Sequence, residues 1–169
     1  MIRYANIVNE SLVDGLGLRT VAFLQGCVRH CEGCHNPGLL PMTGGIEIDE
    51  QEFADLLLSK VTALHKGITF SGGDPLAQPD ALLKTVFLIK HKRPQLNIWV
   101  YTGFTFEEVK RLPVIQLVDV LVDGPFVMEK RDLSLPFRGS SNQRLIDVKR
   151  SLTTGRVVEI STEYDVKVS

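Results

Sequence analysis

The sequence lacks the features typical of membrane, secreted and nucleic-acid-binding proteins. No stretch approaches the roughly 18 uninterrupted apolar residues of a membrane span. The first residues contain no basic segment followed by a long apolar run, so we expect no signal peptide and a cytoplasmic location. The formal net charge of −1 and the pI of about 6.4 indicate neither a nucleic-acid nor a membrane partner. Hydrophobic residues make up 44% of the chain, so disorder is not expected.

Cysteine is scarce and is confined to one short segment. The 169 residues contain Cys27, Cys31 and Cys34, and no fourth cysteine. A secreted disulfide scaffold normally spreads an even number of cysteines along the chain. An odd and tightly clustered set in a reducing compartment instead indicates metal binding or redox chemistry.

The order of the expected elements favours an α/β fold with a mostly parallel sheet. The apolar runs predict strands at residues 20–25, 67–71, 97–102, 118–122 and 157–160. Helical spacing and capping signals predict helices from Asp49 to about His65, at 79–92 and at 106–112. A closed eight-unit barrel usually needs about 200 residues or more. We therefore expect an open, partial (βα) barrel that forms a single domain over residues 1–169.

Four polar or glycine-rich motifs come directly after the expected strands. They are QGC at 25–27, SGGD at 71–74, YTGF at 101–104 and VDGPF at 122–126. Active sites of parallel α/β folds lie at the C-terminal ends of the strands. The four segments are therefore expected to converge on one face and to form the site there.

The spacing Cys27-x-x-x-Cys31-x-x-Cys34 suits one [4Fe–4S] cluster. Ordinary ferredoxin-type clusters use four cysteines, so one iron would here lack a cysteine ligand and stay open to a substrate. The alternative from spacing alone is a structural zinc site with His30 or His35 as fourth ligand. Zinc motifs usually pair cysteines as C-x-x-C with the two halves further apart, so the cluster is favoured. A third possibility, three buried cysteines without a shared function, is disfavoured because all three lie within eight residues.

This cysteine loop, placed after a first strand, resembles that of the radical S-adenosylmethionine (SAM) enzymes. In that family the open iron binds the amino and carboxylate groups of SAM, and an electron from the cluster breaks the bond from sulfur to the 5′ carbon. The resulting 5′-deoxyadenosyl radical abstracts a hydrogen from the substrate. The resemblance implies a [4Fe–4S] cluster on Cys27, Cys31 and Cys34 and SAM as a second cofactor, both positioned by the protein.

Residues 71–75 (SGGDP) are similar to the glycine-glycine-acid motif of this family, which contacts the amino group of SAM. Gly72 and Gly73 would let backbone carbonyls approach the ligand closely, and Asp74 would lie near the ammonium. Taken alone, the motif is explained equally well by a tight strand-to-helix turn.

Residues 14–19 (DGLGLR), followed by FLQGC, resemble the glycyl-radical-activating branch of the family. Arg19 is expected to orient a carboxylate or phosphate-like group, or to form a surface ion pair. One position departs from the wider family, because the residue before the last cysteine is commonly aromatic and packs on adenine. Here that residue is Gly33, so its backbone and the ring of His35 are expected to share the adenine contact.

The polar segment 138–144 (RGSSNQR) narrows the resemblance to one subfamily. With residues 119–126 and the run CHNP at 34–37, it resembles the activators of anaerobic ribonucleoside-triphosphate reductase over roughly residues 10–150. The resemblance implies as substrate a glycine in the large reductase subunit, which would lose its α-hydrogen, and a flavodoxin-type electron donor. Pyruvate formate-lyase activases and deazapurine synthases are the nearest alternatives. A non-catalytic zinc or electron-transfer module is the alternative from another class.

The remaining candidate residues have either both a functional and a purely structural interpretation, or only a structural one. Asp123 is expected to touch SAM or a bound cation, or only to cap the following turn. Residues 138–143 are expected to shape a groove for the glycine loop, or only to form a hydrogen-bonded turn. His30, His65 and His91 are expected at the surface, since no spacing suggests a hydrolytic triad.

Overall fold

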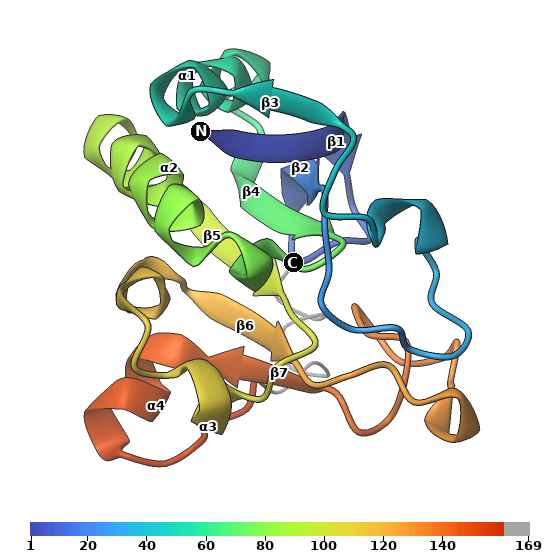
Figure 1. Ribbon diagram of the computed structural model, residues 1–169. Helices are drawn as coiled ribbons and strands as arrows, with labels where there is room; N and C mark the ends of the chain where they lie inside the picture. Colours follow the sequence, from blue (N-terminus) through green and yellow to red (C-terminus); the bar gives the residue numbers. More distant parts are fainter. Residues whose placement is uncertain (161–169) are drawn as a thin grey trace.

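One sheet of seven strands organises residues 1–160, the part of the chain that the computed structural model describes (Figure 1). The strands are β1 (Ile2–Ser11), β2 (Leu18–Leu24), β3 (Ile46–Ile48), β4 (His65–Gly72), β5 (Asn97–Tyr101), β6 (Val120–Asp123) and β7 (Arg144–Asp147). Their order is β3-β1-β2-β4-β5-β6-β7. The central strands β2, β4, β5 and β6 are parallel, whereas the strands at both edges are antiparallel. The sheet stays open, which confirms the predicted α/β class and the absence of barrel closure.

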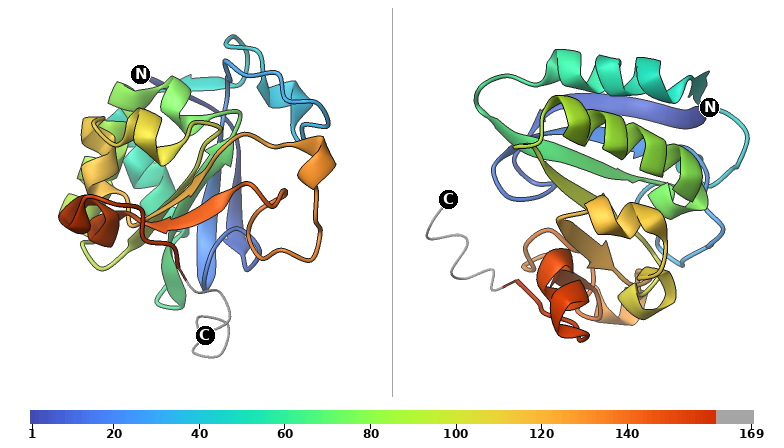
Figure 2. Two further views of the ribbon diagram at one scale, coloured as in Figure 1. Left: turned by 90° about the horizontal axis from the view of Figure 1, so that it is seen from below. Right: turned by 90° about the vertical axis from the view of Figure 1, so that its left-hand side faces the viewer.

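Two long helices cover one face of this sheet. They are α1 (Glu50–Lys60) and α2 (Pro79–Lys92), which lie side by side in Figure 2. Asp49 caps α1 by accepting hydrogen bonds from the amides of Gln51 and Glu52, and α2 has the bounds that the sequence predicted. Apolar residues of both helices pack on the sheet as a fully buried core, which includes Phe53, Leu57, Leu82 and Ile89. Within residues 1–160 we find no helix long and apolar enough to cross a membrane.

Several elements differ from the sequence-based expectation. The strands β1, β3 and β7 and the helix α4 (Val148–Thr154) were not predicted. Helix α3 spans only Phe106–Val109 and is followed by a 3-10 turn at Pro113–Leu117. The expected strand at 157–160 is reduced to a bridge between Glu159 and Ile146 of β7. These edge elements have short or half-exposed apolar patterns, so their pairing depends on neighbours that a local pattern does not reveal.

His65 is buried rather than at the surface, with 7% of its surface exposed. Helix α1 ends at Lys60, before the expected boundary, and the following turn brings the amide of Thr62 to donate to His65 Nδ1 at 3.0 Å. His65 Nε2 lies 2.8 Å from the carbonyl oxygen of Asn9 on β1. The ring therefore joins the start of β4 to β1, whereas His30 and His91 are exposed as expected.

Arg19 contradicts both of its expected roles, because its side chain is 1% exposed and none of its hydrogen bonds to the described residues goes to a carboxylate. The guanidinium donates to the carbonyl oxygens of Leu16, Ile68 and Asn97 and to Thr69 Oγ1. It also lies 5.4 Å from the ring centre of Trp99. Burial lowers the pKa of Arg19 to about 10, yet the group stays charged at neutral pH. Arg19 thus links β2, β4 and β5 inside the fold.

Candidate functional site

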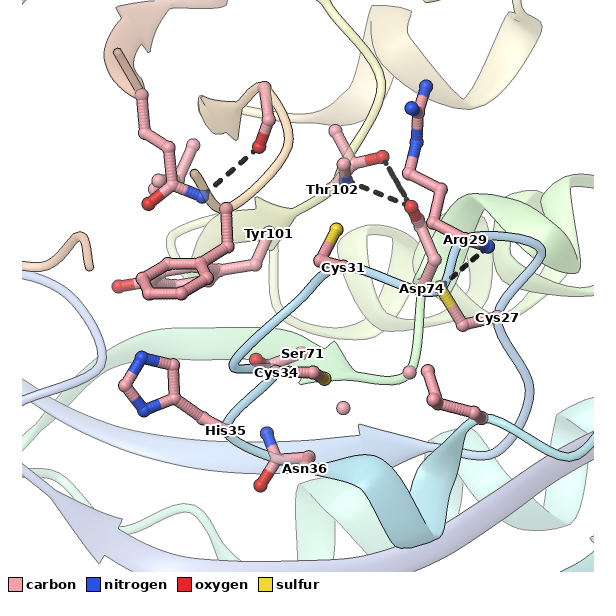
Figure 3. A pocket seen from close by; sticks show the side chains of 18 residues that line it. Cys27, Arg29, Cys31, Cys34, His35, Asn36, Ser71, Asp74, Tyr101 and Thr102 are labelled. Carbon is pink, nitrogen blue, oxygen red and sulfur yellow. Dashed lines mark hydrogen bonds between the residues drawn. The ribbon is translucent and has the colours of Figure 1, made fainter. Parts of the chain in front are cut away.

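A cavity of about 150 Å³ opens at the C-terminal ends of the parallel strands (Figure 3). Each of the four sequence motifs contributes to its wall. The lining includes Cys27, Cys31, Cys34, Ser71, Gly72, Gly73, Asp74, Tyr101, Thr102, Gly103, Gly124 and Phe126. The predicted convergence of the four segments on one face is therefore confirmed.

The three cysteines lie on one loop that follows β2, and all three thiols are free and half-buried. Backbone bonds hold this loop: the amides of Gly26 and Cys27 donate to the carbonyls of Leu39 and Leu40, and Cys34 donates to Cys31. Burial raises the pKa of the Cys27 thiol.

The three cysteine thiols line one cavity, but they do not converge closely enough to bind a single metal ion. No three His, Cys, Asp or Glu side chains of residues 1–160 are placed to bind a single metal ion. Three thiols around a cavity that also has a glycine-rich wall form a donor set that fits an iron–sulfur cluster.

The Gly72-Gly73 turn ties the end of β4 to the start of the cysteine loop. The amide of Gly73 donates to Leu24 at 2.9 Å, and that of Asp74 donates to Gly26 at 2.8 Å. A Cβ on Gly72 would overlap the backbone of Leu24, and one on Gly73 would overlap the carbonyl of Gly26. The close approach that demands glycine here is therefore to the neighbouring strand and loop, and it fixes the turn beside the cysteines.

Asp74 lines the cavity, but its carboxylate is already hydrogen-bonded within the protein. It accepts from the amides of Leu76 and Gly103, both at 2.9 Å, and from Thr102 Oγ1 at 2.9 Å (Figure 3). Burial raises the pKa of Asp74, while these hydrogen bonds and the charge of Arg29 oppose the rise. The carboxylate thus organises the cavity wall where β4 and β5 end.

Gly33 and His35, the two residues expected beside adenine, lie together against a third residue, Phe126. The rings of His35 and Phe126 are 5.0 Å apart and meet edge to face. Gly33 has φ +74°, and a Cβ there would overlap Met128 Cε and lie 3.3 Å from Phe126 Cε1. Phe126 had no individual role among the sequence-based predictions, although it belongs to the VDGPF motif at a strand end.

Asp123 lies behind the cavity wall and not in it, although its neighbours Val122 and Gly124 line the cavity. Its buried carboxylate accepts from the amide of Phe106 at 2.7 Å and from Arg144 Nη2 at 2.6 Å. Asp123 therefore holds the start of α3 and the start of β7. The structure does not support the expected contact with SAM or a cation, since both carboxylate oxygens have protein partners.

The polar segment 138–144 forms hydrogen bonds to the loop after β6. Gln143 Nε2 donates to the carbonyl of Gly124, Asn142 Nδ2 donates to that of Pro125, and the amide of Val127 donates to Ser140 Oγ. Gln143 Oε1 in turn accepts from the amide of Gly139 at 2.9 Å. The segment therefore fixes the wall that carries Phe126.

A second cavity of about 750 Å³ adjoins the first. The two cavities share His35, Asn36, Ser71, Tyr101, Phe126 and Gln143. Two segments whose residues are exposed or half-buried, 12–14 and 133–138, contribute the outer walls of the larger cavity. Sequence analysis assigned Leu12, Val13 and Leu133 no function, and isolated apolar residues in polar loops give no signal that would find them.

Comparison with known proteins defines the class to which this fold and site belong. Residues 13–146 match the family described as "4Fe-4S single cluster domain", so the chain is a single-cluster iron–sulfur protein. The crystal structure of QueE from Escherichia coli aligns with 62% of this chain and 53% of that chain, at 17% identity and a TM-score of 0.42.

Curated relatives narrow the class further. The anaerobic ribonucleoside-triphosphate reductase-activating protein of Pasteurella multocida is 35% identical over 150 residues, which cover 84% of this chain and 95% of the relative. The Escherichia coli K12 protein of that name is 39% identical, with 84% and 96% covered, and that of Enterobacteria phage T4 is 33% identical, with 85% and 93% covered. This chain belongs to the family of anaerobic ribonucleoside-triphosphate reductase-activating proteins. The family and the iron–sulfur cofactor that the sequence predicted are confirmed.

Proposed function

We propose that this protein activates an anaerobic ribonucleoside-triphosphate reductase by generating a glycyl radical on the large subunit of that enzyme. The observation that carries the proposal is the set of three thiols lining one cavity beside the Gly72-Gly73 turn, in a chain whose relatives are named as activating proteins. When bound, a [4Fe–4S] cluster and SAM supply the electron and the 5′-deoxyadenosyl radical that removes the α-hydrogen of glycine.

In this proposal Cys27, Cys31 and Cys34 hold three irons of the cluster. The amide of Arg29 donates to Cys27 Sγ at 3.4 Å, and such a bond orients a sulfur ligand and stabilises its negative charge. The half-buried position of the loop limits the access of water and oxygen to the cluster. Its three thiols leave room for SAM on the side where Ser71 and Tyr101 lie.

The SAM contacts divide between two walls of the cavity. The backbone of Gly72 and Gly73, with Asp74 behind it, receives the methionine end. His35 and Phe126, which line the cavity, receive the adenosine, because two aromatic rings offer a mostly apolar surface to a purine, and Gly33 lies against Phe126 and Met128 beside them.

The larger adjoining cavity admits the glycine-bearing segment of the reductase. Its outer walls expose Leu12, Val13 and Leu133, which are 69%, 76% and 78% exposed and are suited to contact a polypeptide. Arg138 lines the same cavity, so its guanidinium is placed to donate to a carbonyl of the incoming segment.

Electron supply and location complete the proposal. A flavodoxin-type donor approaches the cysteine loop, where Val28 and His30 are exposed. Three neighbouring free thiols suit a reducing compartment, and we infer the cytoplasm.

The test is 5′-deoxyadenosine release by anaerobically reconstituted protein with SAM and dithionite, with and without the reductase large subunit. Release together with a glycyl-radical EPR doublet on that subunit supports the proposal. Release of 5′-deoxyadenosine without a radical on the reductase would mean that the substrate is another molecule. A colourless, zinc-loaded protein without SAM turnover contradicts the chemistry itself. Cys31→Ala removes one ligand, and Gly38→Ala in the same loop is the control, because nothing lies within 4 Å of that position.

A further inference from the structure

Arg29 differs from the other residues around the cavity. Among the described residues that line it, Arg29 is the one lysine or arginine. It lies within the cysteine loop, between Cys27 and Cys31, and its amide donates to Cys27 Sγ. The backbone of Arg29 therefore touches the predicted cluster ligand directly, while its side chain is free to act elsewhere.

The Arg29 side chain crosses from the cysteine loop to the loop between β5 and α3. Its Cζ lies 4.7 Å from the ring centre of Phe104. It passes so close to Gly103 that a Cβ there would lie 2.6 Å from Arg29 Cδ. In Figure 3 the side chain extends past Asp74 and Thr102, away from the cysteines. One side chain thus connects the loop of the thiols to the segment that binds the Asp74 carboxylate.

The charges around Arg29 are unequal in their exposure to solvent. Glu108 Oε2 lies 3.7 Å from Arg29 Nη2, but the Glu108 side chain is about half exposed and its charge is screened. Asp74 is buried, and Arg29 opposes the rise of its pKa. Arg29 Nε is buried without a hydrogen-bond partner among residues 1–160. The guanidinium, whose side chain is 30% exposed, is therefore a partly buried positive charge at the edge of the cavity, and solvent screens it less than a fully exposed one.

A positive charge here affects the redox balance of a bound cluster. A [4Fe–4S] cluster on three thiolates becomes more negative when it accepts an electron, and nearby charge and hydrogen bonds to sulfur tune its potential. Coulomb interactions across a partly buried site are several times stronger than in water. A fixed cation at the cavity wall thus stabilises the reduced form relative to the oxidised form.

We propose that Arg29 is a positioning residue with two functions. Its stacking on Phe104 anchors the cysteine loop to the β5–α3 loop, and its charge raises the reduction potential of the cluster. The inference rests on the proposed function for the presence of the cluster, but neither function of Arg29 follows from the cysteine motif.

The experiment separates the two functions with four variants of the full chain, each reconstituted anaerobically. Arg29→Gln removes the charge and keeps most of the length, Arg29→Lys keeps the charge, and Phe104→Leu removes the ring under the guanidinium. Arg93→Gln is the control, because Arg93 is exposed at the end of α2 and lines neither cavity. The readouts are the midpoint potential from an EPR-monitored titration and the rate of cluster loss to an iron chelator.

Arg29→Gln is expected to shift the midpoint potential to more negative values, and Arg29→Lys and Arg93→Gln to leave it near that of the wild type. Phe104→Leu is expected to lose its cluster faster than the wild type with an unchanged potential. An unchanged potential in Arg29→Gln overturns the electrostatic function, and wild-type cluster retention in Phe104→Leu overturns the anchoring function. Circular dichroism before reconstitution identifies a variant that fails to fold. If Phe104→Leu does not fold, Arg29→Lys tests the anchoring function instead, because lysine stacks more weakly on Phe104 and the variant should lose its cluster faster than the wild type. A wild-type protein without a reducible cluster contradicts the proposed function instead.

Discussion

The Asp74 carboxylate lies 2.9 Å from the amide nitrogen of Gly103, and this hydrogen bond joins the end of β4 to the end of β5. Two further donors, Leu76 N and Thr102 Oγ1, complete the set around the same buried carboxylate. The cofactor cavity therefore depends on one side chain that draws together segments about 30 residues apart in the sequence.

Replacing Asp74 by asparagine is expected to destabilise the cluster-free protein by about 1–3 kcal/mol, because an amide nitrogen then faces a backbone donor in a buried site. The measurement is urea unfolding of the variant and the wild type. Glu129→Gln is the control, since Glu129 is exposed and lines neither cavity. Equal unfolding free energies for Asp74→Asn and the wild type would show that the carboxylate has no structural role.

Gly33→Ala is expected to impair SAM use while leaving the overall fold intact. The new Cβ meets Met128 Cε and the edge of Phe126, and the left-handed backbone at φ +74° costs about 1 kcal/mol for a residue other than glycine. Anaerobic 5′-deoxyadenosine formation is the measurement, with iron content determined alongside. Met128→Ala added to Gly33→Ala should restore part of the activity, because the far end of that side chain is the main obstruction. Gly38→Ala should behave as the wild type, and if both loop variants lose activity equally, the steric explanation is wrong.

Phe137 is the one non-glycine residue of the described chain with positive φ, at 62°, and its ring meets that of Trp99 edge to face at 5.4 Å. Both Phe137→Ala and Phe137→Gly lose this contact, but only glycine avoids the left-handed strain. We therefore expect Phe137→Gly to be more stable than Phe137→Ala by about 1 kcal/mol in urea unfolding, the reverse of the usual order. The same pair of substitutions at exposed Leu133 should show the usual order. A more stable alanine variant at 137 would remove the argument for strain at the wall of the larger cavity.

Asp119 couples stability to pH. Burial raises the pKa of its carboxyl, but hydrogen bonds from Lys90 Nζ at 2.7 Å and the Ile98 amide at 2.8 Å outweigh this effect and hold the pKa below its usual range. A carboxylate whose pKa is lower in the folded state stabilises the fold above its unfolded pKa of about 3.9, and this contribution is lost as the pH falls below that value.

The expected result for Asp119→Asn is a loss of about 1–3 kcal/mol of unfolding free energy near pH 7 and a smaller loss near pH 3. Urea unfolding of the cluster-free protein at the two pH values measures the difference. A loss of equal size at both values would mean that the ionised carboxylate contributes no more than its neutral form. Glu129→Gln again serves as the control and should show no pH-dependent difference.

The local patterns predicted the elements whose stability is itself local or fully buried. Helix α2 has Pro79 at its start and a regular apolar face, and its bounds were predicted correctly. The strands β2, β4, β5 and β6 are near-continuous apolar runs, because helices or further chain cover both faces of a parallel sheet. The strands β1 and β7 pair antiparallel at or near the sheet edges and have mixed burial patterns, so they gave no comparable signal.

The same division holds for single side chains of the site. Cys27, Cys31 and Cys34 were placed together correctly because eight consecutive residues cannot separate them by more than a short loop. Asp123 and His65 were assigned roles or positions that the structure does not give them. Asp123 contacts Phe106 and Arg144, and His65 contacts Asn9. These partners are distant in the sequence and approach only when the sheet forms, so the local sequence does not predict the contacts.

By itself the sequence determined the cofactor class, the family and the parallel α/β core, because a three-cysteine loop, glycine-rich turns and apolar strands are each read within a few residues. Only the tertiary structure decided that the Asp74 carboxylate joins the end of β4 to the end of β5 by hydrogen bonds. It likewise decided that the buried Arg19 guanidinium donates to backbone carbonyl oxygens. It also decided that Phe126 faces His35 and that Arg29 reaches Phe104. Hydrogen bonds, stacking and burial depend on the distance between atoms in space, and for these residues that distance is set by strand pairing across the sheet rather than by separation along the chain.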